Sequence, residues 1–95
     1  LRLALQIQEQ HKAEVNIFLM SDAVVGGLAK QAPSEGYHVQ QMLEILTSQG
    51  TTVKLCKTCT NARGMTELPL AEGVEIGTLI ELADWTMQAD KVLNF

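Results

Sequence analysis

The chain has 95 residues, of which 46% are hydrophobic and 19% are charged. This balance is typical of a globular protein and excludes a disordered chain or a repeat array, and the length fits one domain over residues 1–95. The formal net charge of −4 is too acidic for a general phosphate-backbone binder, so nucleic acid is not an expected partner. A domain of this size buries a thin core, and we therefore expect subunits to share apolar faces.

Neither a membrane span nor a secretion signal is apparent in the sequence. The longest uninterrupted apolar stretch, residues 17–20, is far shorter than the ~20 residues needed to cross a bilayer. No basic segment followed by an apolar one marks a leader. The two cysteines, Cys56 and Cys59, are too few for a disulfide scaffold. The sequence thus predicts a cytoplasmic protein with reduced thiols and no membrane partner.

The first third of the chain predicts a helix, a strand and a loop. Residues 1–10 are amphipathic and resemble the second half of a helix. Residues 15–20 form a compact apolar run with β-branched and aromatic members, which suits a strand of a parallel sheet covered on both faces. Gly26-Gly27 and residues 33–36 indicate a loop region of turn-forming residues.

A second helix and strand follow and lead directly to the cysteines. Apolar residues at i, i+3, i+4 and i+7 predict a helix over residues 37–49, which Gly50 ends. Residues 52–55 alternate polar and apolar, as a short strand does, and this strand delivers Cys56 at its carboxyl end. The two thiols are therefore expected to begin a loop or a helix.

The last third predicts one more helix and a final strand. Ile76, Leu79, Ile80, Ala83 and Met87 form a helical stripe, and Leu82 and Trp85 fall on a second flank. Two apolar flanks on one helix indicate a partner subunit. Residues 91–95 predict a closing strand. This alternation of helices and strands predicts an α/β fold with a parallel sheet and helices on both sides.

The predicted strand ends gather polar and reactive groups at one place. In open parallel sheets, ligands bind outside the carboxyl ends of the strands, where the first strand ends in Ser21-Asp22 and the second in Cys56. Backbone N–H groups at a helix start stabilise a thiolate, which is the nucleophilic form of cysteine. Nearby cations would add to this effect, and those close in sequence are Lys54, Lys57 and Arg63.

Several alternatives stand beside a reactive thiol. Either sulfur can be a small filler of the core, because free cysteine is among the most buried residue types. A zinc site is disfavoured, since only His11 and His38 remain as further ligands and neither has ligand-like spacing. A thioredoxin-type redox pair matches only locally. Asp22 is an equally good candidate for the N-cap of a short helix over residues 23–25.

Segments along nearly the whole chain resemble the DsrE/DsrF-like family, most closely its YchN-type branch. The resemblance is carried by FLMSDAV at 18–24, EGY at 35–37, QQMLEIL at 40–46, VKLCKTCT at 53–60 with Arg63-Gly64, GVEIGT at 73–78 and ADKV at 89–92. It implies a three-layer α/β/α fold with a parallel sheet, and assembly as a trimer or hexamer. It also implies an N-terminal strand ahead of the first helix, so we expect this chain to be part of a longer one from which that strand is missing.

The resemblance also implies a site. Sulfur carriers of the family hold sulfur as a persulfide on a cysteine eight residues before the glycine of an Arg-Gly pair, which corresponds to Cys56 with Arg63-Gly64. Cys56 is then the principal residue, Cys59 a second candidate, and Ser21, Asp22, Lys57, Arg63 and Gly64 support them. Sulfur would pass between donor and acceptor proteins with no metal or organic cofactor.

Cys59 departs from the single-cysteine arrangement of those carriers. A second thiol three residues on can turn a persulfide into a disulfide and release sulfide, which suits a redox protein or sensor better than a stable carrier. A non-enzymatic oligomeric binding module with structural cysteines is the third reading. The resemblance thus leaves open whether the chain is an enzyme.

Overall fold

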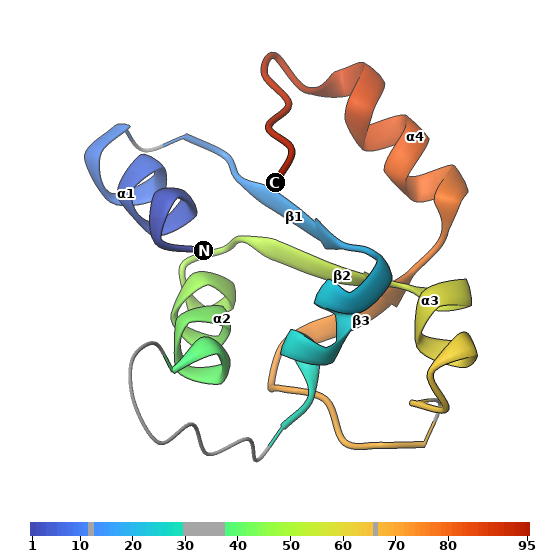
Figure 1. Cartoon of the computed structure of the whole chain (residues 1–95). Helices are drawn as coiled ribbons and strands as arrows, with labels where there is room; N and C mark the ends of the chain where they lie inside the picture. The colour runs from blue at the N-terminus through green and yellow to red at the C-terminus, as the bar shows by residue number, and fades with distance from the viewer. Residues whose placement is uncertain (12, 30–37, 66) are drawn as a thin grey trace.

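The computed structural model describes residues 1–11, 13–29, 38–65 and 67–95 (Figure 1). Its elements are α1 (Arg2–His11), β1 (Asn16–Leu19), the 3-10 helix η1 (Ser21–Gly27), α2 (Val39–Ser48), β2 (Thr52–Cys56), α3 (Lys57–Ala62), β3 (Val74–Gly77) and α4 (Leu79–Gln88). The helix expected over 37–49 and the strands expected over 15–20 and 52–55 are confirmed with small changes of boundary. The loop expected at 33–36 lies outside the described residues.

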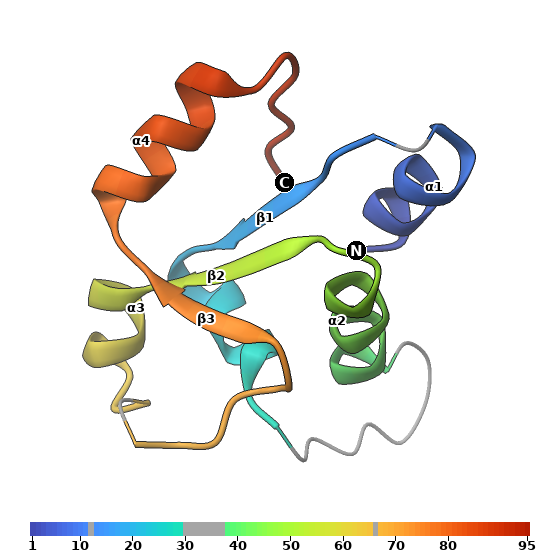
Figure 2. The same ribbon diagram turned by 180° about the vertical axis from the view of Figure 1, so that it is seen from behind.

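The three strands form a parallel sheet in the order β1-β2-β3. Asn16 pairs with Thr52 at one end of the β1–β2 ladder, and Cys56 pairs with Gly77 at the other end of the β2–β3 ladder. All three strands therefore finish at the same edge, next to α3 (Figures 1 and 2). This confirms the predicted parallel sheet and the position of Cys56 at a strand end.

Helices pack on both faces of the sheet. Phe18 and Lys54 are register partners on one face, where the Phe18 ring meets the Trp85 ring of α4 edge-on at 6.1 Å and Lys54 forms an ion pair with Glu81. Leu55 points to the opposite face, because side chains alternate along a strand. There it faces η1 so closely that a Cβ on Gly27 would lie 2.7 Å from its Cδ1. The fold is thus the expected three-layer α/β/α arrangement.

The core lies below the carboxyl edge of the sheet and along α2. Val24 of η1, Leu55 of β2 and Met65 after α3 form one buried cluster, and both cysteines are among the partly buried side chains packed against it. Leu43 and Leu46 on the inward face of α2 are fully buried, which confirms the predicted apolar stripe of that helix. Gly50, at φ 99°, ends α2 in the left-handed conformation that favours glycine.

The C-terminal third differs from the sequence expectation in two respects. Ile76 belongs to β3 and not to the last helix. Thr78 is the N-cap of α4: its side chain accepts a hydrogen bond from the Glu81 N–H in a capping box, so the helix begins only at Leu79. Residues 91–95 carry no regular structure, so the predicted closing strand is wrong. Strand propensity alone does not form a strand, since the ladder needs a neighbouring strand to accept it.

The two apolar flanks of α4 differ in how far they are buried. Leu79, Ile80 and Met87 are exposed by 73%, 75% and 85%, whereas Leu82 and Trp85 on the second flank are half-buried. Both flanks are apolar as predicted, and the second one packs toward the sheet. Within the described part of the chain, no helix is long and apolar enough to cross a membrane.

Candidate active site

Cys56 is both the last residue of β2 and the N-cap of α3. Its Sγ accepts a hydrogen bond from the backbone N–H of Cys59 at 3.4 Å, in the way that a serine or aspartate oxygen caps a helix. The residue is half-buried: it packs on the Leu55 cluster from one side and is open on the other. Cys56 is therefore not a fully buried filler of the core, which was one of the alternatives for this thiol.

The environment of Cys56 favours its thiolate. The pKa of the Cys56 thiol is lowered, first by a side-chain hydrogen bond with Cys59 and next by one with Thr58, whose Oγ1 lies 3.2 Å from Sγ. Partial burial acts in the opposite direction and does not outweigh these hydrogen bonds. A lowered pKa leaves more of the nucleophilic form near neutral pH, which is the property expected of a reactive cysteine.

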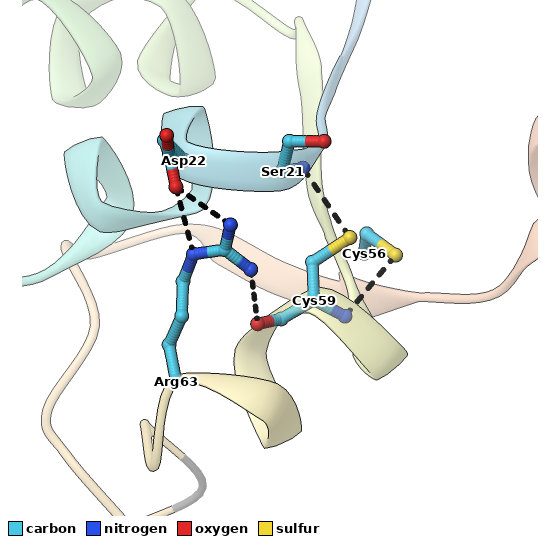
Figure 3. Close-up of polar contacts among 5 residues, drawn as sticks. All are labelled: Ser21, Asp22, Cys56, Cys59 and Arg63. Carbon is cyan, nitrogen blue, oxygen red and sulfur yellow. Dashed lines mark hydrogen bonds and ion pairs between the residues drawn. The ribbon is translucent and has the colours of Figure 1, made fainter.

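Cys59 stands in the first turn of α3 and is also half-buried. Its Sγ accepts a hydrogen bond at 3.3 Å from the backbone N–H of Ser21 (Figure 3). Ser21 has φ 51°, in the left-handed region that residues other than glycine rarely adopt. The first residue of η1 therefore contributes its N–H group, and not its hydroxyl, to the sulfur site.

Arg63 joins η1 to α3. Its Nε and Nη2 donate to Asp22 Oδ1 at 3.2 and 2.6 Å, and its Nη1 donates to the Cys59 carbonyl oxygen at 3.1 Å (Figure 3). Asp22 is therefore the ion-pair partner of Arg63. It is not the N-cap that the sequence offered as an alternative, because Met20 takes that position and no side chain caps η1.

Gly64 has a conformational role next to the site. It has φ 66° and follows the C-cap residue Arg63. The Gly64 N–H bonds to the Asn61 carbonyl, and the Met65 N–H bonds to the Thr60 carbonyl. This pair of hydrogen bonds is a Schellman motif, and it directs Met65 into the core beneath the thiols. The Arg-Gly pair thus ends α3 and fixes its orientation.

The cations near the cysteines are arranged differently from the expectation. Lys54 pairs with Glu81 on α4 and its Nζ lies 5.4 Å from the Trp85 ring centroid, so it serves the packing of α4. Arg63 pairs with Asp22. Lys57 is exposed and forms no ion pair with a described residue. Hydrogen bonds, more than positive charges, therefore set the chemistry of Cys56.

Sequence reasoning missed two contributors. Thr58 lies between the two cysteines, and its spacing from Cys56 was a usable signal, since a residue two positions after an N-cap is near its side chain. The Ser21 N–H had no signal at all, because a positive φ at serine is set by tertiary contacts. His38 is exposed before α2, and the described residues contain no group of three or more His, Cys, Asp or Glu side chains able to hold a metal ion.

Comparison with known proteins agrees with this fold. The model of the DsrE/DsrF-like family matches residues 1–95. Protein YchN of Escherichia coli K12 is 62% identical over 96 residues, covering 100% of this chain and 82% of YchN. An uncharacterized protein of Methanopyrus kandleri is 40% identical over 82 residues, covering 86% of this chain and 68% of that protein.

A solved structure matches the fold as well. The crystal structure of the YchN protein from E. coli has a TM-score of 0.95 and 62% identity, covering 99% of this chain and 81% of that one. The chain belongs to the DsrE/DsrF-like family, which is linked in general to sulfur relay, and it is similar to YchN.

Proposed function

We propose that the chain is a cytoplasmic sulfur-relay protein that carries sulfane sulfur as a persulfide on Cys56. The observation that carries the proposal is the half-exposed Cys56 Sγ at the sheet edge, where the Cys59 N–H and the Thr58 hydroxyl lie within hydrogen-bond distance. These contacts lower the pKa of the Cys56 thiol. Membership of a family linked to sulfur relay supports the same reading.

The transfer conserves atoms and electrons. The Cys56 thiolate attacks the terminal sulfur of a donor persulfide, a sulfur–sulfur bond forms at Cys56, the donor's sulfur–sulfur bond breaks, and the donor leaves as a thiolate. An acceptor thiolate then attacks the terminal sulfur on Cys56 and releases the Cys56 thiolate. The donor and acceptor are proposed to be proteins, because an open sheet edge admits another protein's thiol.

Mass spectrometry after incubation with a persulfide donor tests the site. The peptide that contains Cys56 should gain the mass of one sulfur atom, and a Cys56→Ser variant should lose this gain completely. Cys59→Ser is the matched control, because it removes the other thiol of the same peptide and should still accept sulfur. Equal labelling of Cys56→Ser and the native chain would exclude Cys56 as the carrier.

A dithiol redox function is the second candidate, and the nearness of the two cysteines favours it, because the Cys59 N–H donates to Cys56 Sγ at 3.4 Å. The Cys59 thiolate would attack Cys56 Sγ in the persulfide, form a Cys56–Cys59 disulfide and release hydrosulfide. Thiol counting across a series of glutathione redox buffers separates the two functions. A reversible loss of two thiols per chain supports the redox role, and two thiols retained throughout supports the carrier.

The chain is also proposed to form a homo-oligomer, a trimer or a hexamer, through α4. Three large apolar side chains on one helix, Leu79, Ile80 and Met87, are mostly exposed in the single chain. Large apolar side chains exposed together on one helix of a small domain are typical of an interface.

A further inference from the structure

We propose that Arg63 and Asp22 form a clamp that positions the Cys59 thiol against Cys56 Sγ. The clamp consists of these two side chains and their three hydrogen bonds. The inference rests on the proposed role of Cys56 as the reacting sulfur. Neither Arg63 nor Asp22 is assigned a contact with that sulfur, so both are positioning residues.

The clamp joins the two segments that carry the sulfur contacts. One guanidinium donates to Asp22 Oδ1 through Nε and Nη2 and to the Cys59 carbonyl through Nη1. Asp22 is in η1 and Cys59 is in α3, so the arginine bridges the two segments at the level of the thiols (Figure 3). A planar guanidinium suits this role because it presents several donors in fixed directions.

The bridge acts on the residue next to Asp22. Ser21 holds a left-handed φ of 51°, and a residue other than glycine keeps this conformation only where its surroundings impose it. In that conformation the Ser21 N–H reaches Cys59 Sγ at 3.3 Å. The clamp holds Asp22, the residue next to Ser21 in η1, against Arg63 at the end of α3, and so restrains the segment that carries this N–H.

The Ser21 N–H in turn orients the Cys59 side chain. It occupies the Cys59 sulfur as an acceptor, which leaves the thiol hydrogen of Cys59 free to point toward Cys56 Sγ. A hydrogen bond from Cys59 is the leading cause of the lowered pKa of the Cys56 thiol. Arg63 is therefore connected to the reacting sulfur through Asp22, Ser21 and Cys59 in sequence.

A direct charge effect is the simpler alternative for Arg63. Two features argue against it. The positive charge is paired with Asp22 at close range, and the clamp lies at the surface, where the Asp22 side chain is 97% exposed and solvent screens charge. A direct effect and a positioning effect also differ in whether they depend on Cys59, which makes them separable by experiment.

The test is the pH profile of Cys56 alkylation by iodoacetamide, read on the peptide by mass spectrometry. Asp22→Ala and Arg63→Met should each move the midpoint upward by about half a unit to one unit, the shift expected from the loss of one hydrogen bond. Labelling of Cys56 below the midpoint should then slow by roughly 3- to 10-fold. Arg63→Lys should restore part of the shift, since lysine can pair with Asp22 but lacks the fork.

Two further comparisons make the result specific. The double variant Asp22→Ala/Arg63→Met should show no larger shift than either single variant, because both remove the same clamp. In a Cys59→Ala background, neither clamp variant should move the Cys56 midpoint further. Asp84→Ala, which removes an exposed carboxylate of α4, is the matched control and should leave the midpoint unchanged.

Either of two outcomes would overturn the proposal. The first is an unchanged Cys56 midpoint in both clamp variants, with circular dichroism showing the native fold. The second is an equal shift with and without Cys59, which would make Arg63 a simple charge. Because alkylation requires no sulfur donor, the clamp can fail this test while persulfide transfer to Cys56 stands, and the reverse also holds.

Discussion

The thiol edge of the sheet and the outer flank of α4 are both open to solvent, but they differ in how their side chains are satisfied. At the thiol edge, both sulfurs, Asp22 and Arg63 have hydrogen-bond partners within the chain. On α4, the apolar side chains of Leu79, Ile80 and Met87 have most of their surface exposed to solvent. The polar groups of the first region are satisfied by hydrogen bonds within the chain, whereas the second region exposes apolar surface that another subunit could cover.

The largest expected effect comes from placing a charge on the outer flank of α4. Ile80→Glu should reduce the proposed oligomer to single chains, because an unpaired charge buried in an apolar interface costs about 3–5 kcal/mol. Light scattering coupled to size-exclusion chromatography measures the mass. Gln88→Glu adds the same charge on the same helix at another exposed position and should leave the assembly intact. An unchanged mass for Ile80→Glu would place the interface elsewhere.

A smaller effect is expected where η1 packs beneath the thiol edge. Gly27→Ala should lower the free energy of unfolding by about 1–3 kcal/mol, because its Cβ would lie 2.7 and 2.8 Å from the two Cδ atoms of the fully buried Leu55. Gly26→Ala is the control: its Cβ would lie at an ordinary 3.4 Å from Val39 Cγ1. Urea unfolding measures both variants, and equal stability of the two would show that η1 does not need this close approach.

The smallest effect is the pH dependence of stability at Cys56. Because the pKa of the thiol is lowered in the folded chain, its contribution to stability is complete above the ordinary cysteine pKa and is lost as the pH falls through the folded-state pKa. The native chain should therefore gain stability over Cys56→Ser as the pH rises through this window. Urea unfolding under reducing conditions measures the difference, and a gap that narrows with rising pH would contradict a lowered pKa.

Local patterns of the sequence were sufficient for most of the fold. The apolar spacing of α2, the compact run of β1 and the alternation of β2 each reflect burial that the segment itself encodes, so these elements were predictable. β3 was not predictable, because the segment 74–77 is short and only half apolar. It forms a strand because it pairs with β2. The start of α4 was also placed too early, since the Thr78 capping box outweighed the apolar period through Ile76.

In the candidate site, too, some features were predictable from the sequence and others were not. Cys56, Cys59 and Arg63 were identified from strand-end position, spacing and family resemblance, and the structure brings all three together with Asp22. The partner of each side chain was not predictable. Whether Arg63 pairs with Asp22 or Lys54 with Glu81 depends on how η1 and α4 pack, and the left-handed Ser21 depends on contacts across 38 residues of sequence.

The central claim concerns the sulfur chemistry of one side chain, and persulfide mapping on protein isolated from its own cell tests it most directly. Alkylation at lysis traps the thiols and persulfides, and mass spectrometry locates them on the peptide that contains both cysteines. We predict a trapped persulfide on Cys56. Cys56 found only as a free thiol, in cells whose other carriers do hold persulfide, would contradict a role for this chain in sulfur relay.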